Sequence, residues 1–393
     1  MSARESSAAI APAASGCRRL CAALALVLAA LGACAQDSIA IESAHNRESQ
    51  PSLHVIDGHA PAIGPLGDDA RRVLFASRED DAPPVLGGVA KAMEGRHYLT
   101  SNERSLQAFE PHVRDKGGGY VGVGTDQAYL LIGWQRAEFA WLVDYDPMVV
   151  DMHGIYRALL LAAETPEDFL ALWSRDGRID AHAAIDEHAD AGDRAQLRTL
   201  YRKQRSAVAQ RLAETIETMN GASVSCWLTD EAQYEHVRDL VRHGRTRAML
   251  VDLAADQGLR GIGRAAKKAA IDIEVLYLSN AEEYWRLYPD AFRRDVVALP
   301  MPDDALVLRT LLIWKVNRDY RYNLQRADNF RAWLGESWVG NVYHITYKRP
   351  PADPLVVNTF ETDVWPADAP SALRHAAKKK IRELVAAGYG AAE

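Results

Sequence analysis

The chain has 393 residues, of which 48% are hydrophobic and 25% are charged, a composition typical of globular proteins. This length allows one large domain or two smaller ones, with a core that can fold without disulfides or metal ions. The formal net charge of −7 gives no support for a nucleic-acid partner and argues against a membrane protein recruited by basic residues.

The first 33 residues have the pattern of an export signal. Arg18 and Arg19 precede an apolar run of 12 residues at positions 20–31. A helix of that length is too short to cross the ~30 Å hydrocarbon core of a bilayer. A basic start followed by a short apolar run is instead typical of a secretory signal peptide.

The run ends in Leu31-Gly32-Ala33-Cys34, which resembles a bacterial lipobox. The resemblance implies cleavage before Cys34 and attachment of fatty acyl chains such as palmitate, which would hold the protein to a membrane. Ala35 after the cysteine implies the outer membrane, with the domain facing the periplasm. A plain signal anchor and an uncleaved apolar segment remain alternatives. Cleavage and acylation would leave Cys226 as the remaining possible free thiol, and we expect it to be buried rather than catalytic.

The mature chain divides into three parts by composition. Residues 34–85 are polar, interrupted by Pro and Gly, and are predicted to form a disordered tether. Residues 86–350 carry strong apolar periodicity and are predicted to form one α/β domain, with a helical insertion at 165–220. Residues 351–393 are predicted to be a tail with one helix at 372–386.

Within the domain, apolar runs alternate with helical patterns. A short helix is expected at 103–109, a strand entering a glycine-rich turn at 117–126, a strand at 139–143 and a helix at 149–163. Asp146, followed by Pro147, is expected to cap that last helix. Strands separated by helices predict a mostly parallel, doubly wound, Rossmann-like sheet with helices on both faces. The later apolar runs lie at 249–253, 273–278, 305–312 and 342–347, the last expected as an antiparallel edge strand, with a helix at 261–270.

One motif indicates a ligand site. Gly122 and Gly124 follow the first strand, and Asp144 ends the second, 22 residues after Gly122. A nucleotide-binding βαβ unit has an acid at a similar distance of ~20 residues, because glycines let the backbone approach a ligand and the acid accepts hydrogen bonds from a ribose diol. Tight packing of the glycines and a satisfied turn acid are the structural alternatives.

This pattern resembles the class I S-adenosylmethionine-dependent methyltransferases, and more closely a family of uncharacterised bacterial proteins with that fold. The resemblance covers about residues 95–350 and includes the segment Tyr277-Leu278-Ser279-Asn280. It implies that Gly122, Gly124 and Asp144 contact the cofactor. Ser279 and Asn280 would then lie near the reacting group, with capping of the following helix as the favoured alternative.

The sequence departs from the methyltransferase pattern at two positions. Tyr120 replaces the usual acid before the first glycine, and Asp126 replaces the third glycine. An unpaired Asp126 would repel a carboxylate ligand and favour a cationic or hydroxylated one. The cofactor is also cytoplasmic, whereas the leader predicts export.

Other polar and aromatic residues have open alternatives. Arg309 stands inside an apolar strand and needs either an ion pair or an anion. The aromatics of 320–322, with Trp333 and Trp338, suit a core or lid better than a ligand platform. The histidines have no metal-ligand spacing, so no metal site is predicted.

Two functions therefore remain. The first is an envelope lipoprotein with a ligand-binding or degenerate methyltransferase-like domain for an unknown small molecule. The second is an S-adenosylmethionine-dependent methyltransferase, which needs mainly alignment of donor and acceptor.

Overall fold

A computed structural model describes residues 63–389 of the chain. The predicted signal peptide and the lipidation residue Cys34 therefore lie outside the described residues. Within residues 63–389, no helix combines the length and the apolar character needed to cross a bilayer.

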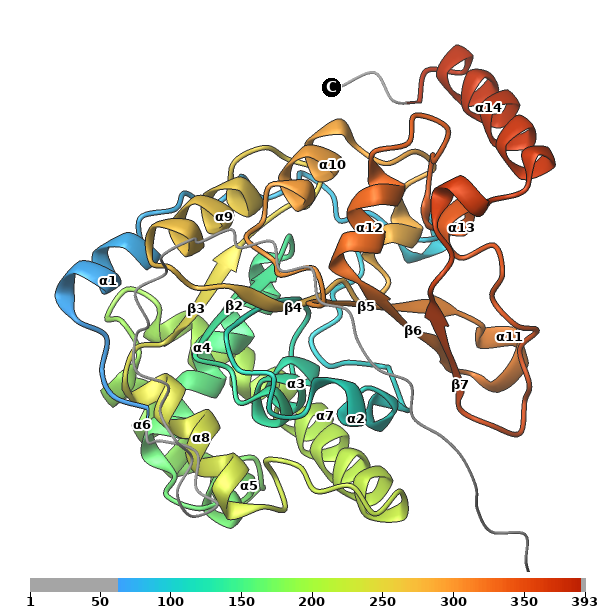
Figure 1. The fold of residues 1–393 in the computed structure, drawn as a ribbon. Helices are drawn as coiled ribbons and strands as arrows, with labels where there is room; N and C mark the ends of the chain where they lie inside the picture. Colours follow the sequence, from blue (N-terminus) through green and yellow to red (C-terminus); the bar gives the residue numbers. More distant parts are fainter. Residues whose placement is uncertain (1–62, 390–393) are drawn as a thin grey trace, which may run out of the picture. The chain divides into compact units, whose positions relative to one another are not determined.

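The centre of the described part is a mostly parallel sheet of seven strands in the order β3-β2-β1-β4-β5-β6-β7 (Figure 1). The first five strands in this order are parallel to one another, β6 runs antiparallel to β5, and β7 is parallel to β6. The arrangement confirms the predicted α/β class, and its first five strands follow the Rossmann order. The strands are β1 (Gly119–Val123), β2 (Phe139–Asp144), β3 (Thr246–Leu250), β4 (Ile273–Tyr277), β5 (Leu306–Leu312), β6 (Tyr320–Arg326) and β7 (Asn358–Thr362).

Helices cover both faces of the sheet, so its central strands are apolar on both sides. Tyr120 and Leu142 belong to the core on the side of α3 and α4, while Val121 and Trp141 belong to the core on the side of α9 and α10. Figure 1 shows these two sets of helices on opposite faces. The helices are α1 (Asp68–Leu74), α2 (Glu110–Val113), α3 (Gln127–Gln135), α4 (Pro147–Ala162), α5 (Pro166–Leu172), α6 (Arg178–His188), α7 (Arg194–Gly221), α8 (Glu231–Arg242), α9 (Gly258–Lys268), α10 (Asp290–Val297), α11 (Trp314–Asn317), α12 (Ala327–Leu334), α13 (Val342–Ile345) and α14 (Ser371–Ala386).

The helical insertion predicted at 165–220 is present as α5, α6 and α7. The capping box of Thr165 and Asp168 starts α5. Helices α6 and α7 both pack against α4, so the insertion forms an outer layer on one side of the sheet. Its longest helix, α7, extends far enough to contact the end of the sheet where the candidate site lies.

The last predicted strand, at 342–347, is wrong. Residues Val342–Ile345 form the helix α13, because Asn341 caps its first turn by accepting a hydrogen bond from the Tyr343 amide at 3.1 Å. Val342 and Ile345, three residues apart, are both buried on one helical face. The edge strand is instead β7, so the sheet continues past the predicted domain end at residue 350.

The predicted tether is also too long at its C-terminal end. Helix α1 lies against α9, and the Asp80 carboxylate accepts the Gly258 amide at 3.1 Å and the Gln257 amide at 3.2 Å at the start of α9. Arg247 of β3 also donates to the Leu74 carbonyl at 2.9 Å. Residues from about 68 onwards are thus part of the folded domain, because polar side chains of this segment satisfy backbone groups of the sheet and its helices.

Candidate functional site

A cavity of about 1060 Å³ lies at the carboxyl ends of β1, β2 and β4. From β1 the chain adds β2 and β3 on one side and β4 and β5 on the other, so these strand ends lie at the point where the direction of winding reverses. Ligands of open α/β sheets bind at such a point. Residues of the segment 83–103, of 251–254 after β3 and of 312–320 after β5 also line the cavity. Its volume is that of a site for a small organic molecule, since such sites measure about 300–1,000 Å³.

The turn after β1 forms one wall and is held rigidly. Gly124 has φ +102°, and a Cβ there would collide with the Gln127 amide. His153 of α4 contacts the Gly124 carbonyl through Nε2 at 2.8 Å, so Nε2 carries the proton and Nδ1 accepts the Tyr129 hydroxyl at 3.0 Å. Burial lowers the pKa of His153 to about 4, which keeps the ring neutral and this tautomer in place.

Asp144 ends β2 and lines the cavity beside Gly124. Its side chain accepts the Asp146 amide at 3.0 Å. Burial raises the pKa of Asp144 from 3.8 to about 7, and the nearby Asp146 carboxylate raises it further against the lowering effect of backbone hydrogen bonds. This acid is therefore half-protonated near neutral pH and can accept or donate a hydrogen bond.

A second buried acid, Glu103, comes from the segment before β1. Its carboxylate accepts hydroxyl groups from Tyr277 at 2.5 Å, Ser279 at 2.9 Å, Thr310 at 2.9 Å and Ser101 at 3.0 Å. The side chain lines the cavity and is only 2% exposed. Burial raises its pKa, while the four hydroxyl donors lower it.

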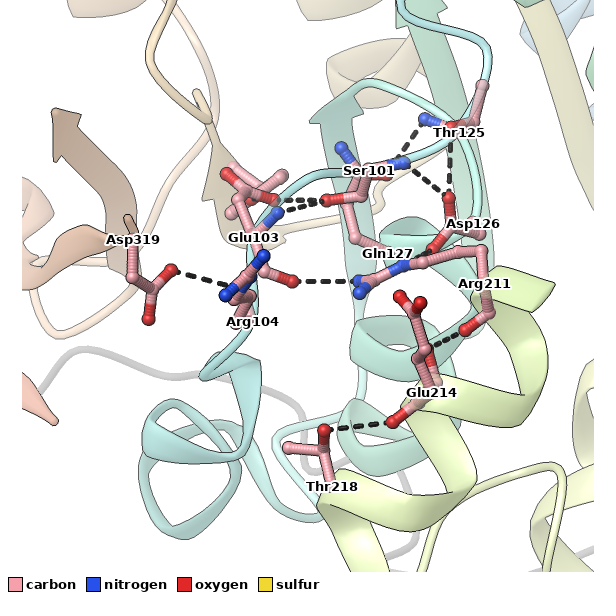
Figure 2. Close-up of polar contacts among 12 residues, drawn as sticks. Ser101, Glu103, Arg104, Thr125, Asp126, Gln127, Arg211, Glu214, Thr218 and Asp319 are labelled. Carbon is pink, nitrogen blue, oxygen red and sulfur yellow. Dashed lines mark hydrogen bonds and ion pairs between the residues drawn. The ribbon is translucent and has the colours of Figure 1, made fainter. Parts of the chain in front are cut away.

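Arg211 of α7 holds the Glu103 segment against the glycine-rich turn, as Figure 2 shows. Its guanidinium contacts the Asp126 carboxylate at 2.8 Å and the Glu103 carbonyl oxygen at 2.8 Å. The other Asp126 oxygen accepts the Ser101 amide at 2.6 Å. Asp126 is thus paired and points away from the cavity, so it does not supply the repulsion expected of an unpaired acid.

A model of a domain of unknown function, DUF7790, matches residues 98–359, two thirds of the chain. The chain belongs to this family. No curated protein matches the chain. The matched range of the DUF7790 domain begins just before Ser101 and Glu103 and ends within β7, so it includes most of the cavity and the whole Arg211 contact network.

Of the site residues predicted for the DUF7790 domain, the structure brings four together. Gly124, Asp144, Ser279 and Asn280 all line the cavity. Asp126 and Gly122 do not: Asp126 is paired as described, and Gly122 lies under the ring and hydroxyl of Tyr120. Gly122 therefore provides room for a neighbouring side chain rather than for a ligand.

Several structural alternatives are resolved as well. The Asp146 side chain accepts the Met148 amide at 2.9 Å at the start of α4, which confirms the predicted cap. Asn280 precedes a short 3-10 helix without a side-chain cap. Ser279 has φ +49°, a conformation unusual for serine, and its hydroxyl points to Glu103.

Arg309 takes the ion-pair alternative, with Glu282 as its partner and with further contacts to Asn323 at 2.8 Å and Gln325 at 2.6 Å. Cys226 is buried as predicted, and burial raises the pKa of its thiol. No cluster of metal-ligating side chains occurs within residues 63–389. Trp333 and Trp338 belong to the core, whereas Tyr320 lines the cavity.

Sequence patterns did not identify Glu103 as a site residue. The segment 103–109 has the periodicity of a short helix, but only 106–108 and 110–113 are helical. Nothing near Glu103 in the sequence marks it, because all but one of its hydroxyl partners lie more than 170 residues away. The cavity aromatics Tyr145 and Tyr284 were also missed as lining residues, although both directly follow predicted strands or turns.

Proposed function

We propose that this DUF7790 protein is an envelope lipoprotein whose α/β domain binds a small molecule bearing a diol, such as a nucleoside. The proposed lipid anchor is Cys34, and the proposed location is the outer membrane, facing the periplasm. The observation that supports binding most directly is Asp144, which lies at the edge of the cavity beside Gly124 without a cationic partner among residues 63–389.

The binding proposal rests on charge and hydrogen-bonding capacity. A buried carboxylate normally pairs with a cation or with several donors. Asp144 accepts backbone amides on one side, and its remaining capacity faces the cavity. A ribose diol offers two hydroxyl donors at the spacing that one carboxylate accepts, as in nucleotide-binding folds with an acid at the same strand end.

The test is a calorimetric titration of the full-length chain in detergent with adenosine and with S-adenosylmethionine. We expect binding in the micromolar range that Asp144→Asn weakens at least tenfold. Asp180→Asn, at an exposed position on α6, is the matched control and should bind as the wild type does. Absence of heat with both ligands, in a protein that unfolds cooperatively, would contradict the nucleoside proposal.

Methyl transfer from S-adenosylmethionine is the second candidate. The strand order β3-β2-β1-β4-β5 and the placement of Gly124 and Asp144 favour it, and methyl transfer needs alignment more than acid–base groups. Export to the periplasm would separate the domain from a cytoplasmic cofactor. Binding of S-adenosylmethionine alone, without adenosine binding, together with a cytoplasmic location would favour this candidate.

The location has its own test. Full-length protein and its Cys34→Ala variant are expressed in a bacterium with two membranes, fractionated and analysed by mass spectrometry. The wild type should be found in the outer membrane with an acylated Cys34 at its amino terminus. The variant should lose the acyl mass. An unmodified cytosolic chain that retains its first 33 residues would refute the lipoprotein proposal.

A further inference from the structure

The buried acids of this domain fall into two groups. Glu110, Asp126, Glu282 and Asp295 each contact an arginine. Five others have no lysine or arginine partner among residues 63–389: Asp80 and Asp319, which lie outside the cavity, Asp146, which contacts His97, and Glu103 and Asp144, which line the cavity. Arg211 lies close to Glu103 but contacts its backbone carbonyl rather than its carboxylate. Glu103 and Asp144 are therefore the two buried acids of the cavity wall that have no ion-pair partner among residues 63–389.

Basic residues do line the cavity, but only at its mouth. Arg96 and Lys315 are both exposed to solvent. Water and salt screen exposed charges such as these, so they interact weakly with a ligand. Charges inside a cavity are screened less and interact with a ligand more strongly. A ligand that reaches the interior is thus selected for positive charge by Glu103 and Asp144.

Aromatic rings also form part of the cavity wall. Tyr145, Tyr284, Trp285, Trp314 and Tyr320 all line the same cavity, and the rings of Tyr145 and Tyr284 meet edge-on at a centroid distance of 6.4 Å. Burial raises the pKa of Tyr145 to about 12, and the negative charges of Asp144 and Asp146 raise it further, so its ring stays neutral. Neutral aromatic faces beside carboxylates are the usual surroundings of a bound organic cation.

The Glu103 hydrogen bonds also specify the kind of cation. One carboxylate oxygen accepts the hydroxyls of Tyr277 and Ser101, and the other accepts those of Ser279 and Thr310. Because a carboxylate offers about four acceptor positions, few remain for N–H donors of a ligand. A primary ammonium would leave its N–H groups without acceptors at this place. A cation without N–H groups loses no hydrogen bonds here and is still attracted to the Glu103 carboxylate.

We propose that the cavity binds an alkylated organic cation of the quaternary ammonium type between the Glu103 carboxylate and the aromatic wall. The inference takes the cavity to be a ligand site, as proposed above, and adds the charge of its ligand. The segment 101–103 is held by contacts within the protein itself, because Arg211 and Asp126 both hydrogen-bond to it (Figure 2). Preformed sites bind without the entropy cost of ordering a loop.

The experiment compares three probes by ligand-observed NMR on the full-length chain in detergent. Choline carries the quaternary ammonium, 3,3-dimethyl-1-butanol is its neutral isostere, and ethanolamine is its primary ammonium counterpart. We expect choline to bind at least tenfold more tightly than either of the others. Equal binding of choline and the neutral isostere, or no binding of choline, would overturn the proposal. Tighter binding of ethanolamine would overturn the choice of an alkylated cation.

Variants link the binding to the named residues. Glu103→Gln should weaken choline binding at least tenfold, whereas Glu110→Gln, which changes a buried acid that Arg114 neutralises outside the cavity, should not. Tyr284→Phe keeps the ring and should bind choline, while Tyr284→Leu should not. If Glu103→Gln fails to fold, the Tyr284 pair alone decides. Choline contains no diol, so its binding is independent of the adenosine result, and either proposal can fail alone.

Discussion

Replacing Asp144 with asparagine should stabilise the domain at alkaline pH, and the gain should disappear in acid. The pKa of Asp144 is raised from 3.8 to about 7 by burial and by the Asp146 carboxylate. Between these two pH values the folded protein holds a proton that the unfolded chain has released. At this residue the unfolded state therefore binds fewer protons, and the contribution of Asp144 to the free energy of unfolding falls as pH rises from about 4 to about 7.

The size of this effect follows from the two pKa values. At ~1.4 kcal/mol per tenfold change in proton affinity, a rise from 3.8 to about 7 corresponds to about 4 kcal/mol. Asparagine keeps the oxygen that accepts the Asp146 amide but carries no charge. The stability of Asp144→Asn relative to the wild type should thus increase by about 4 kcal/mol between pH 4 and pH 8.

Urea unfolding followed by circular dichroism at pH 4, 6 and 8 measures this difference directly. Asp180→Asn serves as the control, because it removes a carboxylate at an exposed position outside the cavity. A constant difference between Asp144→Asn and the wild type across this range would refute the reasoning, and so would a difference that favours the variant less at pH 8 than at pH 4. An acid that destabilises the protein at neutral pH is expected at a binding site rather than in a purely structural turn.

Three further outcomes are expected. Arg309→Met leaves the Glu282 carboxylate buried without its cation and should lower the free energy of unfolding by about 3–5 kcal/mol in urea; a loss below ~1 kcal/mol would show that the pair contributes little. Gly124→Ala puts a side chain at φ +102° against Gln127 and should lower the free energy of unfolding by ~1–3 kcal/mol, as thermal unfolding can measure. Gly192→Ala, where no atom lies near the new Cβ, is the control and should lower it far less. The ring of His153 should stay neutral until about pH 4 with its proton on Nε2, as ¹⁵N NMR can measure. The contribution of His153 to the free energy of unfolding should fall as pH drops from about 6.5 towards 4. Titration of the ring near pH 6.5 would contradict its buried contacts.

Local patterns were sufficient for most of the parallel sheet. The strands β1, β2, β4 and β5, the helix α4 with its Asp146 cap, and the insertion all lie where apolar period and capping residues predicted them. Local patterns also predicted Gly124 and Asp144 as site residues, because both stand at carboxyl ends of strands that a parallel sheet brings together. These features depend on residues close in sequence, whose geometry the chain determines locally.

Tertiary contacts decided the rest. Residues 342–347 alternate like a strand, but the Asn341 cap and the buried face of Val342 and Ile345 make the start of this segment a helix. The sequence predicts that an unpaired Asp126 repels a carboxylate ligand, but Arg211, 85 residues further along the chain, pairs with this acid. Glu103 became a site residue only because Tyr277, Ser279 and Thr310 converge on it from β4 and β5. Whether a buried acid is paired or faces a cavity depends on the side chains around it. Those side chains come from distant parts of the chain, so the local sequence does not reveal them.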